Sequence, residues 1–215
     1  MNLFGYISDR WDKLSLMAYL HTSVVVQCTV LAAVIGVLIG VAVYRSAVGS
    51  AVATALASTI LTIPSFALLG LLIPFSGLGS TTTVIALVLY ALLPIVRNTI
   101  VGLAGVDPAV TDAAKGIGMS RVGVLTRVEL RLAWPAILAG MRVATQMLMG
   151  IAVIAAYAKG PGLGSQVFSG LANAGSANSL NEALTGTVGV VILALILDGV
   201  YVIINRLTVS RGVRG

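Results

Sequence analysis

Long apolar runs, each about the length that crosses a bilayer, constrain this chain more than any other feature. Five such stretches occupy roughly residues 22–44, 51–73, 82–105, 136–158 and 183–205. A helix of about 20 apolar residues spans the hydrocarbon core and satisfies its own backbone hydrogen bonds there. Only 9% of the residues are charged, too few to cover the surface of a soluble domain. The sequence therefore predicts an all-α integral membrane protein with about five transmembrane helices in a single domain, residues 1–215.

The placement of Lys and Arg predicts the orientation of these spans. Cytoplasmic segments of membrane proteins carry an excess of Lys and Arg. With the N-terminus outside, eight such residues fall on the inner side: Arg45, Lys115, Arg121, Arg127, Arg131, Arg206, Arg211 and Arg214. Three fall on the outer side: Arg10, Lys13 and Lys159. We expect an outer N-terminus and a cytoplasmic C-terminus. The net charge of +6 reflects this asymmetry rather than nucleic-acid binding, because no basic stretch is interleaved with aromatic residues.

Residues 1–20 precede the first apolar run. Charged residues interrupt any apolar core that a cleaved signal peptide needs. Apolar residues nevertheless recur here at helical spacing: Leu3, Ile7, Trp11, Leu14 and Ala18. The pattern favours a short helix lying in the outer membrane interface, with Trp11 at headgroup depth. A frayed terminus is the alternative.

The longest polar segment, residues 106–135, lies between the third and fourth runs. Its capping signals are Asp107 and Pro108 to begin a first short helix, Gly116 or Gly118 to end it, Ser120 to begin a second, and Pro135 to begin the fourth span. These signals predict two short helices joined by a glycine turn. Together they would form a compact, rigid projection on which a cytoplasmic partner can dock. A simple connector is the alternative, but it needs far fewer residues.

The same segment carries a spaced motif. Its members are Asp112-Ala113-Ala114, Gly118 after three residues, Val128 after nine more, and Leu130. The pattern resembles the EAA loop of permease subunits of ATP-binding-cassette importers, whose fold is the smaller, type I (MetI-like) permease fold. That loop usually opens with Glu and ends Ile-x-Leu-Pro. Here Asp112, Val128 and Arg131 stand in place of the Glu, the Ile and the Pro.

Further segments resemble one subfamily, the permeases of glycine betaine, carnitine and choline importers. They are TIPS at 62–65, LYALLPIVRNT at 89–99, GVDPA at 105–109 and GLG at 162–164. The residues KGP at 159–161 depart from the small residues expected before the last motif.

The resemblance implies a set of partners in a bacterial cytoplasmic membrane. They are two cytoplasmic ATPase subunits, a second permease subunit, identical or related, and an extracytoplasmic substrate-binding protein. The ATPase would dock on Thr111, Asp112, Ala113, Ala114, Lys115 and Gly118, beside Ile117 and Met119. The chain has no Gly-x-x-x-x-Gly-Lys-Ser/Thr phosphate loop. We therefore expect ATP hydrolysis in a separate subunit, and no catalytic residue, cofactor or metal in this one.

Three ionisable residues fall inside the apolar runs: Arg97, Arg142 and Asp198. Each costs about 2.5–3.5 kcal/mol at the centre of a span, and such residues usually have partners. We expect Asp198 to pair with Arg142 or Arg97. The pair is either an inner gate that rearranges during transport or a static structural pair.

Aromatic rings offer candidates for the substrate path. A quaternary ammonium ion is attracted to aromatic faces, and Phe66, Tyr90 and Tyr157 lie in or near the spans. Ordinary packing or interfacial anchoring is the alternative for these three. The single histidine, His21, stands where the first run begins and is expected at the interface.

The residues alone leave two other function classes to weigh. A secondary transporter or channel working without an ATPase is possible, because Pro64 and Pro94 can break helices and Asp198 can couple a cation. A membrane-embedded enzyme is disfavoured, because the chain has no clustered His or Cys and no paired carboxylates. The EAA-like loop favours the importer.

Overall fold

The computed structural model describes residues 2–209, and every regular element in that range is helical. The helices are α1 (Leu3–Asp9), α2 (Trp11–Val43), α3 (Ala47–Thr62), α4 (Ser65–Ser76), α5 (Ser80–Ala104), α6 (Pro108–Gly116), α7 (Arg121–Val124), the π-helix η1 (Leu125–Glu129), α8 (Leu130–Ala155), the 3₁₀-helix η2 (Ala156–Ala158), α9 (Gly164–Ala172) and α10 (Ser179–Thr208). Arg211 and Arg214, which entered the charge count above, lie outside the described residues.

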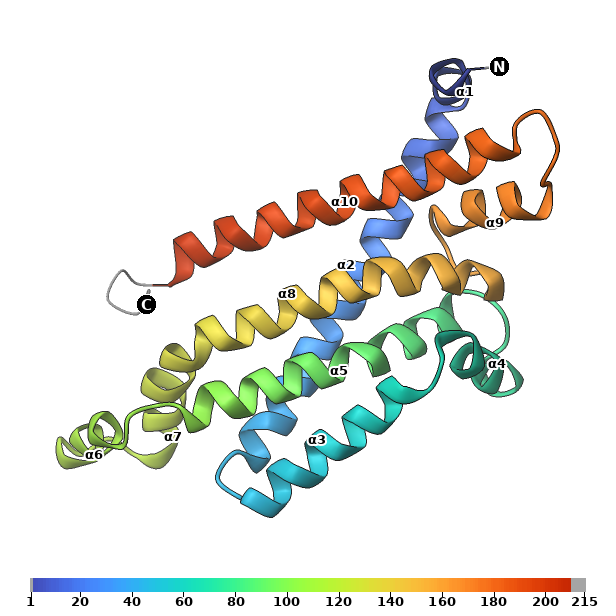
Figure 1. Ribbon diagram of the computed structural model, residues 1–215. Coiled ribbons are helices and arrows are strands. Elements are labelled where there is room, and N and C mark those ends of the chain that lie inside the picture. The colour runs from blue at the N-terminus through green and yellow to red at the C-terminus, as the bar shows by residue number, and fades with distance from the viewer. Residues whose placement is uncertain (1, 210–215) are drawn as a thin grey trace.

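The long helices form one layer with a single helix crossing it. Figure 1 shows α3, α5, α8 and α10 in succession, with α2 running obliquely behind them. The helices α6 and α7 lie at one end of the layer, with the turn between α2 and α3; we call this the α6 end. The helices α1, α4 and α9 lie at the opposite end, the α9 end. Alternate helices therefore run in opposite directions between these two ends.

The structure has four to five candidate spans, against about five expected, because one expected span is bent sharply. Four helical segments are long and apolar enough to cross a membrane: Trp11–Val43, Ser80–Ala104, Arg121–Ala158 and Ser179–Thr208. The fifth run, expected as one span over 51–73, consists of α3 and α4, which meet at 95°.

The break occurs at the dipeptide Ile63-Pro64. A residue before proline is driven out of the α conformation, and Ile63 is extended, with φ −71° and ψ 125°. The phenol of Tyr90 donates to the Ile63 carbonyl at 2.6 Å, which satisfies an acceptor that the broken helix leaves free. Pro94, by contrast, lies inside an uninterrupted α5.

The N-terminal prediction needs correction. The first span begins at Trp11 rather than near residue 22, and its 33 residues make a helix about 50 Å long. The separate helix expected over 1–20 is only α1, because the residues from Trp11 onward belong to α2. This helix is fixed to α9, because Tyr6 is buried and its hydroxyl donates to Gln166 at 2.9 Å. The buried contact shows that α1 packs on protein rather than only on lipid.

His21 was expected at the interface and is instead fully buried. The cause is the longer α2, which places His21 ten residues inside the helix, against α8. Its Nε2 lies 3.2 Å from the carbonyl oxygen of Met149. Because a carbonyl can only accept, Nε2 carries the proton.

The loop between the third and fourth spans begins as predicted. Asp107 caps α6 by accepting from the amide of Ala109 at 2.8 Å. Gly118 takes a left-handed conformation, φ 88°, and Ser120 caps α7 by accepting from Gly123 at 3.1 Å.

The end of this loop differs from the prediction. The segments α7, η1 and α8 form one continuous helix, so the second short helix does not stop before the span. Pro135 lies inside α8 rather than at its start. The loss of one backbone hydrogen bond is tolerated in a membrane-spanning helix that is packed on its neighbours.

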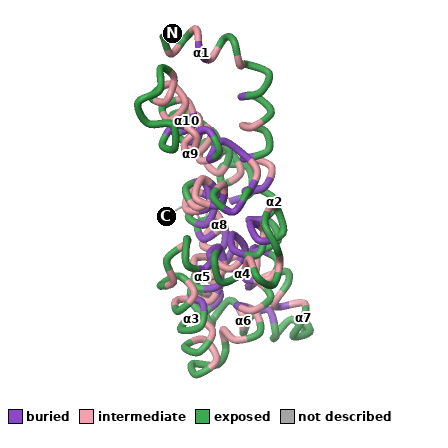
Figure 2. The backbone as a smooth tube through the Cα atoms, turned by 90° about the vertical axis from the view of Figure 1, so that its right-hand side faces the viewer, coloured by how far each residue is buried: buried purple, intermediate pink, exposed green. Residues whose placement is uncertain are grey.

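Small residues bring α5 and α8 together. A Cβ on Gly140 would lie 2.7 Å from the carbonyl oxygen of Pro94, and one on Gly102 would lie 2.8 Å from Ala136 Cβ. Such residues allow membrane helices to approach closely. Figure 2 shows the buried residues gathered where α2, α5 and α8 meet. Helix α10 stands outside this core, with 6% of its most apolar window buried against 44% for the other three long spans.

We predict that Gly140→Ala destabilises the fold. The added methyl group meets a backbone carbonyl that cannot rotate away, and overpacking of this kind costs about 1–3 kcal/mol. Thermal unfolding of the purified protein in detergent should show a lower Tm. Gly150→Ala on the same helix is the matched control, because nothing lies within 4 Å of a Cβ there. Equal Tm values for the two variants would contradict the close contact.

Candidate functional site

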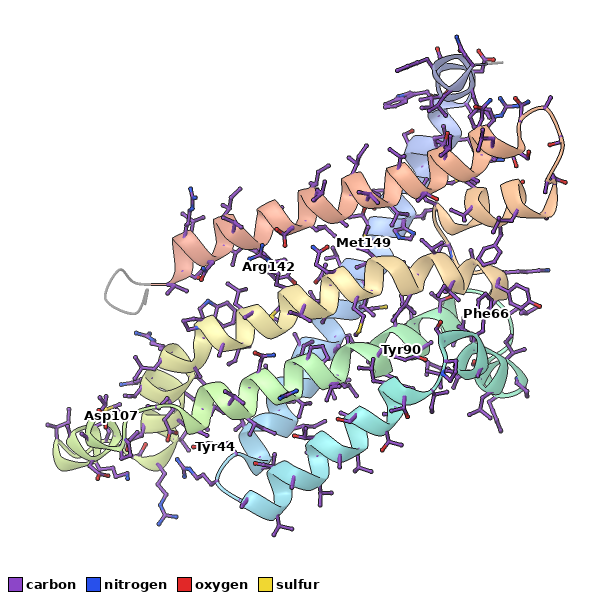
Figure 3. All side chains as sticks on the ribbon, viewed as in Figure 1. Tyr44, Phe66, Tyr90, Asp107, Arg142 and Met149 are labelled. Carbon is purple, nitrogen blue, oxygen red and sulfur yellow. The ribbon has the colours of Figure 1, made fainter. Side chains whose placement is uncertain are left out.

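Three aromatic rings meet at the α9 end. Phe66 of α4 lies 5.3 Å from Tyr157 of η2 and 6.2 Å from Phe168 of α9, and the last two rings are 6.1 Å apart. The Phe66 ring is nearly perpendicular to each of the others, at 77° and 90°, the edge-to-face arrangement that aromatic pairs prefer. Figure 3 shows Phe66 beside α4 at this end. We call these three residues the aromatic cluster.

Two of the three rings of the cluster are open to the surroundings. Phe66 is 47% exposed and Tyr157 is 67% exposed. Phe168 was not predicted, because α9 lies outside the apolar runs and no local pattern distinguishes its ring. Tyr90, the third predicted path residue, is 2% exposed and lies at the α3–α4 break. The structure therefore brings Phe66 and Tyr157 together but places Tyr90 in the core.

A glycine loop positions the cluster. It connects η2 to α9, and its glycines lie directly on the neighbouring helices. A Cβ on Gly162, whose φ is 118°, would lie 2.6 Å from His21 Nδ1, and one on Gly160 would lie 2.5 Å from Thr83 Oγ1. Lys159 takes a left-handed φ of 61°, a conformation that side chains rarely adopt. The departure from small residues at Lys159 therefore puts a long side chain at a backbone conformation that glycine adopts more easily.

The intramembrane charges are partly brought together. Arg142 on α8 donates through Nε and Nη2 to the two carboxylate oxygens of Asp198 on α10, both at 2.6 Å. The predicted pairing of Asp198 is confirmed, with Arg142 as the partner. Arg97 is exposed on α5 and makes no ion pair within residues 2–209.

This ion pair is one of several polar contacts between α8 and α10. Thr145 Oγ1 lies 2.9 Å from the Tyr201 hydroxyl, and Gln146 Nε2 donates to the Ala194 carbonyl at 3.1 Å. Figure 3 shows Arg142 in the space between the two helices. We call these contacts the polar seam. Sequence reasoning found only its charged members, because Thr, Gln and Tyr do not stand out against an apolar run.

The polar seam constrains what its face can contact. The side chains of Arg142 and Asp198 are 44% and 33% exposed. Ionised groups within a span avoid lipid tails and face protein or a water-filled cavity. This side of α8 and α10 therefore faces water or another protein surface.

The residues of the EAA-like loop divide into an inward and an outward set. Ala114 is 7% exposed, whereas Asp112 and Ala113 are exposed. Asp112 also accepts from Lys115 at 2.9 Å, one turn along the same helix. The loop presents large apolar residues as well, because Ile117 is 82% and Val122 70% exposed. Both residues lie at the α6 end, but single exposed apolar residues do not by themselves define a contact surface.

Comparison with known proteins places this geometry in a family. Residues 32–209 match the family described as "Binding-protein-dependent transport system inner membrane component". The chain is 38% identical over 156 residues to the glycine betaine/carnitine/choline transport system permease protein OpuCB of Bacillus subtilis (strain 168), covering 73% of this chain and 70% of that protein. It is 34% identical over 219 residues to the osmoprotectant import permease protein OsmW of Salmonella typhimurium (strain LT2), with both chains covered completely.

A solved structure has the same fold. A chain of the inward-facing MetNI methionine ABC transporter superposes with a TM-score of 0.77 at 21% identity, covering 92% of this chain and 96% of that one. The family match over residues 32–209 begins within α2, runs through α10 and includes the EAA-like loop. The chain belongs to the family of inner membrane components of binding-protein-dependent transport systems, and it is a permease of the MetI-like fold.

Proposed function

We propose that this chain forms the translocation path of an ATP-driven importer for a quaternary-ammonium osmoprotectant such as glycine betaine, choline or carnitine. The observation that carries the proposal is α6, a capped helix whose outward face is offered to a partner beyond the ends of the spans. Relatives named for osmoprotectant import support the substrate class. Cytoplasmic ATPase subunits, a second permease subunit and an external binding protein complete the transporter. An ATPase-independent transporter has no comparable support.

The α6 end is proposed to face the cytoplasm. Segments at that end carry Arg45, Lys115, Arg121 and Arg127, whereas segments at the α9 end carry Arg10, Lys13 and Lys159. This distribution follows the positive-inside rule. It gives an external N-terminus and a cytoplasmic C-terminus in a bacterial inner membrane.

The outward face of α6 is proposed as the ATPase-docking surface. Ala113 permits close approach of the partner backbone, and Ile117 offers apolar area. Thr111, Asp112, Lys115 and Gly118 are the other residues proposed to dock, while the inward Ala114 sets α6 against the rest of the loop. Rigid-body movement of α6 would then open the path alternately to each side.

The face that carries the polar seam is proposed to line the path, and Arg97 of α5 is proposed to reach the same path. A second permease subunit would cover this face, which removes its charged groups from lipid. The aromatic cluster stands at the external end of the same subunit, where a quaternary ammonium ion can contact the exposed rings of Phe66 and Tyr157. The path thus has an aromatic entrance and a charged inner half.

The docking proposal predicts that Ile117→Asp separates the ATPase from the permease. A carboxylate at the centre of an apolar contact loses its hydration without gaining a partner. We expect at least tenfold less ATPase to copurify with the permease after coexpression with its genomic neighbours, and substrate-stimulated ATP hydrolysis to be lost. Ala177→Asp adds the same side chain at the opposite end of the molecule and should have no effect. If Ile117→Asp retains full ATPase binding, α6 is not the docking helix.

The path proposal predicts that Tyr157→Leu slows uptake of choline at least fivefold. Leu keeps apolar bulk but removes the π-face that attracts the cation. Tyr157→Phe retains the ring and is expected to transport within twofold of the wild type. Initial rates of radiolabelled uptake at saturating binding protein distinguish the two variants. Equal rates for Leu and Phe would show that the ring face takes no part.

The seam proposal predicts that Asp198→Asn lowers uptake at least fivefold at an unchanged amount of protein in the membrane. The substitution leaves Arg142 charged without its counter-ion, which is more harmful than removing both charges. The double variant Arg142→Gln/Asp198→Asn should therefore recover part of the activity. Normal transport by Asp198→Asn would remove the pair from the transport cycle.

A further inference from the structure

A buried carboxylate stands at the boundary between the loop and α8. Glu129 is the last residue of η1, and its side chain is 8% exposed. Glu residues are almost never this buried without partners. The π-helical turn that carries Glu129 is of a kind found often at functional sites. Neither the docking surface nor the path described above uses this residue.

The partners of Glu129 come from the turn between α2 and α3. The Tyr44 hydroxyl donates to Oε2 at 2.8 Å, and Arg45 Nη2 donates to Oε1 at 3.2 Å and to Oε2 at 3.1 Å. The Arg45 guanidinium also lies over the Tyr44 ring, 5.0 Å from its centroid. Burial, together with the bond to Glu129, raises the pKa of Tyr44, so its phenol remains a donor. Both carboxylate oxygens are thus engaged by residues about 85 positions away.

This contact joins two segments that are far apart in the sequence, the α2–α3 turn and the end of the loop. The loop is continuous with α5 at one side and with α8 at the other, whereas α2 and α3 are not attached to it. Helix α6 packs mainly on α7 and η1. A pocket of about 800 Å³, lined among others by Tyr44, Arg45, Lys115 and Glu129, separates the loop from the helix ends. Figure 3 shows Tyr44 at the turn and Asp107 at the start of α6, both at this end.

We infer that Glu129 is a positioning residue that makes the α2–α3 turn move with the coupling loop. A displacement of α6 passes to α7 and η1 and then, through the charged hydrogen bonds of Glu129, to the turn. Helix α2 already packs closely on α5, so the bonds of Glu129 add the α2–α3 turn itself to the parts that move with the loop when the ATPase subunits close. The inference rests on the proposed function for its role in transport. The bonds between Glu129 and the α2–α3 turn lie within this chain, so they can be tested without the partner subunits.

The first test measures solute imported per ATP hydrolysed by the complete transporter in proteoliposomes. Glu129→Gln and Arg45→Met each remove the ionic bond from one side, and we expect each to lower this ratio at least fivefold, with ATP hydrolysis within twofold of the wild type. Arg45 is largely exposed, so its variant tests the link even where Glu129→Gln does not assemble.

Arg45→Lys keeps the charge and should keep the ratio within twofold. Combining Glu129→Gln with Arg45→Met should cost no more than either alone, because both break one interaction. A native ratio in Glu129→Gln or Arg45→Met overturns the inference.

The second test is independent of transport. Hydrogen–deuterium exchange of the backbone amides of residues 45–50 in the purified permease reports how firmly the turn is held. We expect at least tenfold faster exchange there in Glu129→Gln than in the wild type. Thr126→Ala is the matched control, because Thr126 lies in the same segment and bonds only within its own helix. Unchanged exchange in Glu129→Gln disproves the link. A wild-type complex without ATP-driven import would refute the proposed function and the role in transport, but the exchange result would still decide the link.

Discussion

At Gly140, the backbone of α8 comes so close to α5 that a single methyl group would lie 2.7 Å from the Pro94 carbonyl oxygen. These two helices bracket the EAA-like loop, since α5 ends and the helix of α7 and α8 begins on either side of it. Their close contact holds the ends of the loop at a fixed separation, so that α6 can project as a rigid element. The same contact supplies the surface on which α2 packs from behind. The position of α6, the proposed docking helix, therefore depends on small residues within the spans.

The two sides of this core are built by different physical means. Helix α2 adheres through close apolar packing, with a Cβ on Gly36 or Gly40 meeting Ile95 or Thr99 of α5 at less than 3 Å. Helix α10 packs closely on α9, where a Cβ on Gly170 or Gly186 would meet the facing helix at less than 3 Å. It meets α8 through the polar seam and buries little of its apolar surface. Apolar packing in a membrane gains nothing from water exclusion, because lipid is as apolar as Leu, so a polar contact gives α10 an orientation that packing alone would not. Close apolar packing thus attaches α2 to this core, whereas polar contacts attach α10 to it.

Sequence reasoning recovered the features that have local causes. The apolar runs, the caps at Asp107 and Ser120 and the left-handed Gly118 all follow from nearby residues. The prolines show where it fails, because Pro64 ends a helix whereas Pro94 and Pro135 lie inside helices. At Pro64 the break is accompanied by a distant contact, since Tyr90 donates to the Ile63 carbonyl, and no local pattern distinguishes this proline from the other two. The aromatic cluster and the partners of Glu129 likewise depend on contacts between distant segments, which no local pattern encodes.

The polar seam has a consequence for how hydration acts on the fold. The attraction between two opposite charges weakens as the dielectric constant around them rises. Arg142 and Asp198 are partly exposed on the face proposed to line the path, so water entering such a path would surround this contact. In a dry, closed path the same two side chains would attract each other more strongly. Hydration of the path would thus change the strength of one contact between α8 and α10, while the packing of α10 on α9 stays the same.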